Sequence, residues 1–410
     1  MTTAWAETTL DNATVYNRSG YWGDETASDR RPCKVKVIRN ADLTKSGVLR
    51  GYATRHFSEK EAENSALQIN DVAMTTSGDV GKIWEVDAPD YFASNFVRIL
   101  RPDPELISPG FLPLALATES VQSALVENTG GATIQNLRKD FYSSAKFALP
   151  PLDEQRRIVG ILKEAFDDIA TARANAEQNL ESAHVLLDSQ LQSVFIERRK
   201  DSEEVPIGSL CDFLNGFAFK SPDAIQTSST QLVRMGNLYG NRLNLERSPA
   251  FYPDSFAVEH KRYLLKEDDL IMSLTGTMGK EDYGYAVRIP ECSHALLMNQ
   301  RIAKFDSIRE DIVDRRYLFY YLRSRAFLDL LYPTAKGTRQ ANLSTVTIKT
   351  LPVPLCPLER QVAVASSLEE IEEQTQRLAH LYERKLVELE DLKKSLLHQA
   401  FTGQLGAQAA

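Results

Sequence analysis

The sequence lacks the features that would place the protein in a membrane or outside the cell. No apolar run approaches the roughly 18 residues that a membrane span requires. The N-terminus has no basic stretch followed by an apolar core, which a secretory signal would show. The four cysteines lie far apart, without a CxxC pair. This spacing argues against a disulfide framework and a zinc cluster, and we expect the protein in a reducing cytoplasm.

The motifs of common catalytic sites are also missing. Residues 276–280 resemble the end of a phosphate-binding loop, but Leu274 stands where its first glycine is required and Glu281 stands where Ser or Thr should follow the lysine. There is no GxGxxG after an expected strand, no HExxH, no nucleophile elbow and no Asn-Pro-Pro-aromatic tetrad of the amino-methyltransferases. The sequence therefore predicts no catalytic residue, metal site or cofactor in this chain. A fused enzyme with unrecognised catalytic residues stays an alternative.

The charge that is present is distributed unevenly. The 410 residues carry a formal net charge of −8. Residues 153–197 hold nine acidic and four basic side chains, and residues 357–402 hold nine acidic and six basic ones, so these stretches account for the whole excess. The neutral remainder can still carry a basic face for phosphates, whereas the acidic stretches should avoid them. Solvation of two long helices explains the acids about equally well.

One segment of the chain occurs twice, 206 positions apart. The matched pairs include Gly131/Gly337, Asn136/Asn342, Gln155/Gln361, Leu162/Leu368, Leu191/Leu397 and Phe195/Phe401. A weaker match joins residues 71–82 with residues 269–280. Two related units whose polar residues differ predict one task performed on two targets, which is the organisation of a bipartite recognition protein.

The fold class predicted from these patterns is α+β, with a pseudo-twofold repeat of two β-rich mixed domains and two long helices. Residues 35–39 and 95–100 are expected as strands, and residues 109–126 and 315–332 as buried helices. Apolar residues recur at helical spacing through both acidic stretches, where each helix would reach roughly 65 Å. Helices of that length with one apolar stripe are not stable alone, so we expect an antiparallel coiled coil; separate packing of each helix on its own domain is the alternative.

The predicted boundaries are 1–150 for the first domain, 151–198 for its helix, 199–206 for a linker, 207–350 for the second domain, 351–405 for its helix and 406–410 for a tail.

Four polar loops in two matched pairs are the candidate DNA contacts. The loops at 75–82 and 273–280 combine hydroxyls, two glycines and a lysine, which suit phosphate. The loops at 128–136 and 335–342 carry Arg, Gln and Asn, the side chains able to contact base edges. Turns between strands explain any single loop about equally well. The predicted DNA-binding residues are Arg39, Thr75, Thr76, Ser77, Lys82, Gln135 and Asn136 in the first domain, and Lys220, Arg234, Asn237, Ser273, Thr275, Thr277, Lys280, Lys336, Thr338, Arg339, Gln340 and Asn342 in the second.

The chain resembles the specificity subunits of type I restriction–modification systems over essentially its whole length. The residues that carry the resemblance are the runs 337–343 and 351–361, their counterparts 130–141 and 149–159, and the segments GFAFKS (216–221), VRMGNL (233–238) and LLHQAFTGQL (396–405). The proline-leucine-acid-x-Gln start of a long helix, present twice, is fairly specific. The first domain departs most from the pattern, with GYWGDE (20–25) in place of GFAFKS.

The resemblance implies a non-catalytic subunit that reads double-stranded DNA. Each globular domain would be a target-recognition domain for one half of a split, asymmetric site, and the paired helices would act as a ruler and dock the modification (methyltransferase) subunits. Two modification and two restriction (translocase and nuclease) subunits are expected, with S-adenosylmethionine, ATP and magnesium bound by those partners. The main alternative is a coiled-coil scaffold whose globular domains bind protein, which a basic face on both domains would disfavour.

Overall fold

The computed structural model describes residues 5–197 and 202–405. The chain divides into two compact units. Unit 1 comprises Met1–Ala176 and Arg384–Ala410, and unit 2 comprises Glu177–Glu383. Each long helix contributes one part to each unit.

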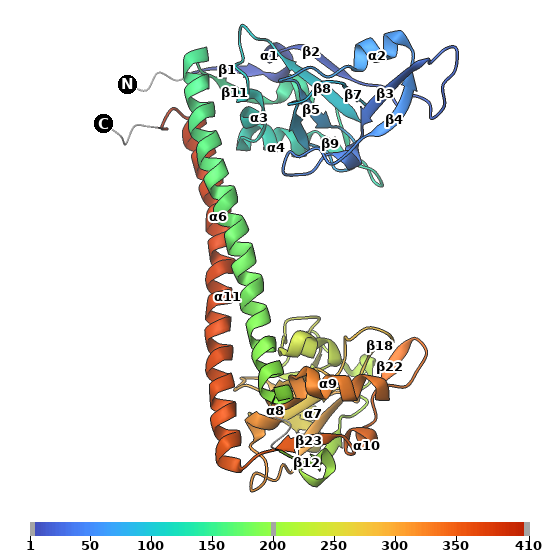
Figure 1. Ribbon diagram of the computed structural model, residues 1–410, viewed down its shortest axis with the longest axis vertical. Helices are drawn as coiled ribbons and strands as arrows, with labels where there is room; N and C mark the ends of the chain where they lie inside the picture. Colours follow the sequence, from blue (N-terminus) through green and yellow to red (C-terminus); the bar gives the residue numbers. More distant parts are fainter. Residues whose placement is uncertain (1–4, 198–201, 406–410) are drawn as a thin grey trace. The chain divides into compact units, whose positions relative to one another are not determined.

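Unit 1 holds a mixed set of strands and short helices (Figure 1). Its strands are β1 (Ala6–Thr9), β2 (Thr14–Ser19), β3 (Cys33–Ile38), β4 (Ala53–Phe57), β5 (Val72–Thr75), β6 (Ile83–Glu85), β7 (Tyr91–Ala93), β8 (Val97–Pro102), β9 (Thr129–Gly130), β10 (Asn136–Leu137) and β11 (Lys146–Leu149). Its short helices are α1 (Leu10–Ala13), η1 (Asn40–Asp42), α2 (Glu59–Ser65), α3 (Phe111–Leu116), α4 (Glu119–Glu127) and α5 (Phe141–Ser144). The four-stranded sheet has the order β2-β8-β5-β6, the three-stranded sheet has the order β4-β3-β7, and β1 pairs with β11.

Unit 2 repeats this architecture. Its strands are β12 (Glu203–Pro206), β13 (Asp212–Asn215), β14 (Thr230–Val233), β15 (Phe251–Tyr252), β16 (Leu264–Leu265), β17 (Leu270–Ser273), β18 (Thr275–Thr277), β19 (Ala286–Arg288), β20 (Ala295–Met298), β21 (Ile302–Asp306), β22 (Gln340–Asn342) and β23 (Pro352–Leu355). Its short helices are η4 (Ile207–Ser209), η5 (Ser221–Asp223), η6 (Met235–Asn241), α7 (Ser255–Glu259), η7 (Lys261–Tyr263), α8 (Arg315–Arg323), α9 (Arg325–Leu331), η8 (Tyr332–Thr334) and α10 (Thr345–Ile348).

The strand orders of the two units correspond. The sheets of unit 2 run β13-β21-β17-β19 and β15-β14-β20-β16, and β12 pairs with β23. Each unit has one parallel pair at the same place, β3 with β7 and β14 with β20, while the neighbouring pairs of these sheets are antiparallel. The repeat predicted from the sequence is therefore a repeat of topology.

Four segments differ in detail from the prediction. The single helix predicted at 109–126 is divided into α3 and α4, because Thr118 between them has extended backbone. The linker predicted at 199–206 includes strand β12, which pairs antiparallel with β23 and half-buries Val205 opposite Val353. The single helix predicted at 315–332 is divided, because Ser324 has extended backbone and its hydroxyl caps the N-terminus of α9. The predicted tail 406–410 lies outside the described residues, as does the start of the linker.

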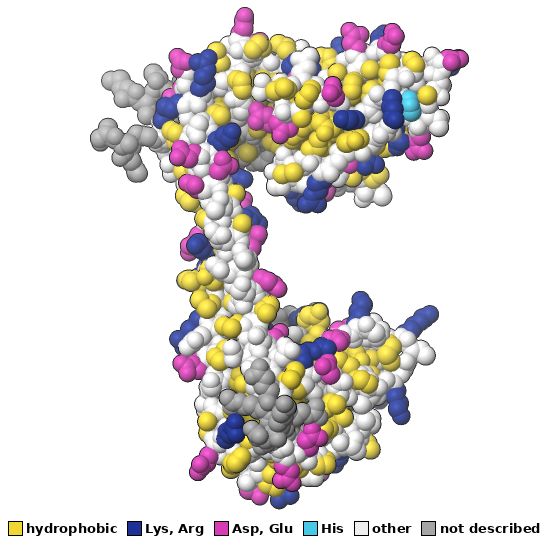
Figure 2. Space-filling view, in the orientation of Figure 1, with side chains coloured by type: hydrophobic (Ala, Val, Ile, Leu, Met, Phe, Trp, Pro, Cys, Tyr) yellow, Lys and Arg dark blue, Asp and Glu magenta, His cyan; other side chains and the backbone are white. Residues whose placement is uncertain are grey.

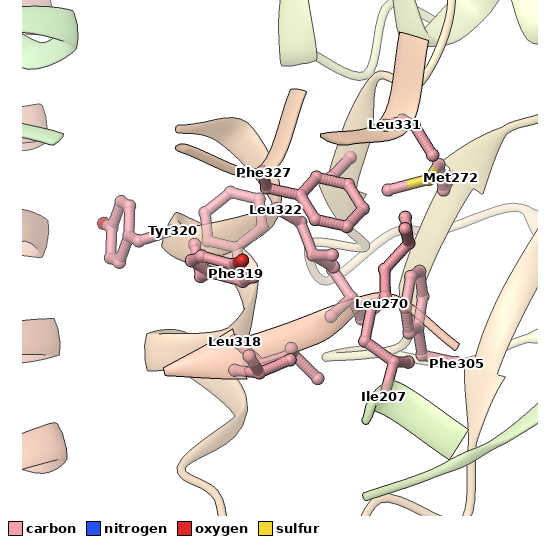
Figure 3. Close-up of a cluster of buried hydrophobic side chains, with 14 of the residues drawn as sticks. Ile207, Leu270, Met272, Phe305, Leu318, Phe319, Tyr320, Leu322, Phe327 and Leu331 are labelled. Carbon is pink, nitrogen blue, oxygen red and sulfur yellow. The ribbon is translucent and has the colours of Figure 1, made fainter. Parts of the chain in front are cut away.

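In each unit a large cluster of apolar side chains joins a sheet to the short helices and the long helices. In unit 2, Leu270 and Met272 of β17 pack with Phe305 of β21 and with Leu318 and Phe327 of the helices (Figure 3). In unit 1 the equivalent cluster joins β5 and β8 to α3, α4 and the long helices. Each sheet is thereby fixed against the helix that follows it in the chain.

The long helices are α6 (Leu152–Gln192), extended by a π-helical turn at Ser193–Glu197, and α11 (Leu358–Phe401). In unit 1 the start of α6, at Ile158 and Leu162, shares a core with Ala400 near the end of α11. In unit 2 the end of α6, at Leu191, packs with Leu368 near the start of α11. The two pairings make the helices antiparallel and confirm the predicted coiled coil. Within the described residues no helix is long and apolar enough to cross a membrane.

One buried glutamine attaches the start of each long helix to its domain. Gln155 accepts a hydrogen bond from the Ser108 N–H (2.9 Å), and its Nε2 donates to the carbonyls of Leu106 and Pro150 (both 2.8 Å). Gln361 makes the same three bonds with Asp314 N (2.9 Å), Ile312 O (3.1 Å) and Cys356 O (2.7 Å). The proline-leucine-acid-x-Gln motif thus has a structural role in both repeats.

Candidate nucleic-acid interface

The two polar loops of unit 2 meet as a short antiparallel ribbon. Strand β18 of the first loop pairs with β22 of the second, with Thr275 opposite Asn342 and Thr277 opposite Gln340. The ribbon continues in the Leu343 N–H, which donates to Leu274 O (2.8 Å), and in the Met278 N–H, which donates to Arg339 O (3.0 Å). The segments predicted from separate parts of the sequence therefore form one surface element.

Unit 1 joins its loops at the corresponding positions. Ser77 and Asn136 form an antiparallel bridge, which matches the Thr275–Asn342 pair of unit 2. The Leu137 N–H donates to Thr76 O (2.9 Å), and the Gly78 N–H donates to Gln135 O (2.8 Å). The duplication extends from the topology to individual backbone hydrogen bonds.

A glycine with positive φ shapes the second loop in both units. Gly131 has φ 143° and Gly337 has φ 133°, values that disfavour residues with a Cβ. A Cβ on either residue would lie 2.0 Å from a carbonyl oxygen of its own loop, Ile134 O in unit 1 and Gln340 O in unit 2. Only glycine allows the loop to fold back on itself here.

Ten of the predicted DNA-binding residues are exposed. They are Gln135 and Asn136 in unit 1, and Lys220, Thr277, Lys280, Lys336, Thr338, Arg339, Gln340 and Asn342 in unit 2. Most belong to the two loop pairs, whereas Lys220 precedes η5, and no described hydrogen bond joins its segment to the β18–β22 ribbon. In Figure 2 dark blue side chains project from unit 2 at the end where Figure 1 draws β18 and β22. Unit 2 thus presents cations and amides together on one element.

Five predicted residues are buried, and the side chains of four of them hydrogen-bond within the fold. Thr75 Oγ1 donates to Asp79 O (2.5 Å), Thr275 Oγ1 donates to Met235 Sδ (2.9 Å), and Ser273 Oγ accepts from the Tyr285 N–H (3.1 Å). Ser77 and Asn237 complete the set, at 9% and 2% exposure. The Asn237 side chain accepts from Arg234 N and donates to Asn244 O and Arg247 O. These side chains position the loops and are less suited to contact DNA than the exposed ones.

The four remaining predicted residues, Arg39, Thr76, Lys82 and Arg234, are half-buried. Arg39 forms a bidentate ion pair with Asp42, which occupies its guanidinium. Lys82 pairs with Asp79 (3.1 Å) and lowers the pKa of that carboxyl, and its Nζ also donates to Asn40 O (3.3 Å). Arg234 donates to Ser248 O. The cations of unit 1 are therefore more engaged than Lys280, Lys336 and Arg339 of unit 2, for which the described residues provide no ion pair.

An acidic side chain shapes the first loop of unit 2. Asp282 accepts hydrogen bonds from Thr277 N (2.6 Å) and Thr277 Oγ1 (2.8 Å). Burial raises the pKa of Asp282, but the bonds from Thr277 outweigh it and hold that pKa below its ordinary value. The carboxylate stays ionised inside the loop, while Lys280 at the loop surface supplies a positive charge.

The sequence did not identify a third segment at the interface. Residues 94–96, between β7 and β8, and residues 299–301, between β20 and β21, hydrogen-bond to the first polar loop of their units through Phe96 O and Arg301 O. In unit 1 the prediction had assigned residues 95–100 to a strand. Neither turn contains glycine or a motif, so only the pairing of its flanking strands locates it.

The described part of the chain holds no cluster of three His, Cys, Asp or Glu arranged for a metal ion. Its two topologically matched units, each with paired loops of exposed polar side chains, have the organisation of a two-part recognition protein. The sheet order, loop pairing and helix anchoring occur twice, so each unit offers its own surface.

Comparison with known proteins identifies the family. The model of the type I restriction modification DNA specificity domain matches residues 21–181 and again residues 199–388. The chain belongs to this family, and its function is that of a DNA specificity subunit whose two repeated domains fit the recognition of a bipartite site.

Individual relatives are distant in sequence. The chain is 24% identical over 297 residues to the MjaVIII specificity subunit of Methanocaldococcus jannaschii, and the alignment covers 69% of this chain and 68% of that protein. It is 25% identical over 194 residues to the EcoAI specificity subunit of Escherichia coli, covering 47% of this chain and 31% of that protein.

Solved structures share the fold. A chain from a structure describing complex assembly and conformational transition of the type I R-M system matches with a TM-score of 0.73 and 18% identity, and the HsdS subunit from Thermoanaerobacter tengcongensis matches with 0.59 and 18%. Both alignments cover 98% of each chain.

Proposed function

We propose that each unit reads one half of a split, asymmetric double-stranded DNA site through its paired loops. The observation that carries the proposal is the loop pair itself, present in both units with the same backbone bonds but with different exposed side chains. The same backbone arrangement positions the loops alike in both units. The exposed side chains differ, with Gln135 in unit 1 and Arg339 and Gln340 in unit 2, so the two units would select different bases.

We further propose that the chain has no catalytic activity of its own. It would dock two modification subunits and two restriction subunits, because the repeat supplies two similar surfaces. S-adenosylmethionine, ATP and magnesium would be bound by those partners. Support comes from the family membership and from the missing catalytic motifs in the sequence. A test of methyl-donor binding by the isolated chain should give no binding, and saturable binding would contradict this part.

The loop contacts are tested by two variants in unit 2. If Lys280 contacts a phosphate, Lys280→Ala should weaken binding to all DNA sequences and lower the salt slope by about one. If Arg339 contacts a guanine, Arg339→Ala should cost ~1–3 kcal/mol on the cognate duplex and relax one half-site. Arg377→Ala is the control, since its side chain is 80% exposed on α11, away from the loops. Unchanged affinity in both loop variants, with unchanged folding, would favour the protein-binding scaffold.

A further inference from the structure

The turns at 94–96 and 299–301 lie beside the paired loops in both units. In unit 2 the Leu274 N–H donates to Arg301 O (2.9 Å), while Leu274 O accepts from the Leu343 N–H (2.8 Å) on its other side. In unit 1 the Thr76 N–H donates to Phe96 O (2.9 Å), and Thr76 O accepts from the Leu137 N–H (2.9 Å). One residue of the first loop thus bridges the turn and the second loop, and three segments lie side by side.

Backbone bonds fix the conformation of each turn. The N–H of Asn299 donates to Val233 O (3.1 Å), and the N–H of Ser94 donates to Ile38 O (3.1 Å), at matched positions of the two sheets. Each turn is closed by a bond to its first residue, from Ile302 N to Asn299 O (3.0 Å) and from Val97 N to Ser94 O (3.0 Å). A turn whose backbone is held at both ends needs no further backbone ordering on binding, which favours specific binding.

The side chains that these turns present are exposed and differ between the units. Unit 2 exposes Gln300 and Arg301, and unit 1 exposes Asn95 and Phe96, whose exposure is 44%. Among the described residues, the polar groups of the Asn95, Gln300 and Arg301 side chains have no hydrogen-bond or ion-pair partner. Their backbones are constrained while these groups stay available, which is the arrangement expected of contact residues rather than of residues that support the fold.

We propose that each unit contacts bases with its turn as well as with its two loops. In unit 2, Arg301 recognises a guanine, and in unit 1, Phe96 recognises the methyl group of a thymine. Arginine makes bidentate contacts with guanine O6 and N7, and phenylalanine makes apolar contact with the thymine methyl. Gln300 and Asn95 carry amides that suit adenine at a neighbouring position. The inference rests on the proposed function, because it requires that the adjoining loops face DNA.

The choice of DNA over protein follows from the neighbours of the turns. Arg301 adjoins the loop of Lys280, and that loop is paired with the loop of Arg339, so three exposed cations belong to hydrogen-bonded segments. Such a group is the electrostatic footprint of a phosphate-lined groove.

The experiment measures binding of the complex with its modification subunits to its own site, defined by methylation-site sequencing, and to every single base-pair substitution of that site. Arg301→Ala should lower affinity for the cognate duplex about five- to 150-fold and abolish discrimination at one base pair in one half-site. Phe96→Ala should lower affinity about fourfold, the effect of one buried methyl, and relax one A·T pair in the other half-site. Arg309→Ala, beyond the opposite end of β21, and Ile69→Ala, beyond the opposite end of β5, should change neither.

A modified base isolates the arginine contact. Replacing the contacted guanine by 7-deazaguanine removes one acceptor, so it should weaken binding of the wild type and leave the binding of Arg301→Ala unchanged. Arg301→Lys keeps the charge but loses the fork geometry, so it should lose discrimination while retaining the salt slope.

Several outcomes would overturn the inference. A uniform loss across all duplexes in Arg301→Ala would make Arg301 a phosphate contact, and a loss of complex assembly with modification subunits would make the turn a protein contact. If the turn variants bind and discriminate like the wild type while the Lys280 and Arg339 variants are impaired, the role of the turns is rejected and the role of the loops stands. Full binding in the loop variants as well would reject the proposed function with it.

Discussion

At the scale of single residues, chemical type alone does not decide between a contact and a structural role. Asn237, in the segment VRMGNL, and Asn342, in a polar loop, are both predicted from the sequence to contact DNA. The structure buries Asn237 and bonds its amide to three backbone groups, while it leaves Asn342 exposed on β22. The burial of Asn237 depends on how the following segment folds back, because its amide donates to the carbonyls of Asn244 and Arg247, and residue type alone carries no information on that path.

Gln361 is expected to contribute strongly to the stability of unit 2. It is 1% exposed and satisfies three backbone groups at the start of α11, so Gln361→Ala leaves buried polar groups without partners. We expect a loss of about 1–3 kcal/mol in the free energy of unfolding, measured by denaturant titration. Gln374→Ala, on the exposed face of the same helix, should stay within about 0.5 kcal/mol of the wild type. Equal stability of the two variants would show that the glutamine does not attach helix to domain.

Glu369 should give unit 2 a stability that depends on pH. Burial raises the pKa of its carboxyl, but ion pairs with Arg288 (2.7 Å) and Arg316 (3.2 Å) outweigh burial and lower that pKa. A lowered pKa stabilises the fold above the unfolded value of ~4.3, and this stabilisation is lost as pH falls through the folded pKa. Glu369→Gln should therefore destabilise the protein at pH 7 and match the wild type more closely at pH 4. The neighbouring exposed Glu370→Gln is the control, and a pH-independent difference for Glu369→Gln would contradict the ion-pair account.

At the scale of elements, the sequence predicted the helices and strands that are repeated or whose apolar residues recur at regular spacing. The strands at 35–39 and 95–100, the two long helices and their antiparallel pairing follow from apolar spacing and are present as β3, β8, α6 and α11. Strand β12 was missed because its pairing partner, β23, lies about 150 residues later in the chain. The break at Ser324 was missed because its neighbours Arg323 and Arg325 are good helix formers, and apolar residues continue at helical spacing on both sides.

The β22 loop should depend on the left-handed glycine at its start. In Gly337→Ala the new Cβ would lie 2.0 Å from Gln340 O, so the loop must change conformation and displace Arg339 and Gln340. We expect weaker DNA binding with relaxed specificity in one half-site, and a stability loss of about 1–3 kcal/mol. Gly160→Ala is a matched control on α6, where no atom lies near the added methyl, and it should stabilise the helix by about 0.5–1 kcal/mol. Normal specificity in Gly337→Ala would separate the loop conformation from recognition.

At the scale of the whole molecule, two units with one topology each carry a loop surface, and both long helices contribute to each unit. The chain belongs to a family of DNA specificity subunits, and its two repeated domains fit one half-site each. Independence of the two readers follows from the separate cores and the separate loop pairs of the units.

The most direct measurement is methylation-site sequencing after exchange of one recognition domain. Residues 207–350 suit the exchange because their ends already meet, through the Ile207 N–H bonded to Leu351 O (2.9 Å) and the Gly208 N–H bonded to Lys349 O (2.9 Å). With the equivalent region of a relative in place, the modified sites should change in one half only, while the other half stays that of the wild type. Sites changed in both halves by this single exchange would contradict independent recognition and indicate one composite site.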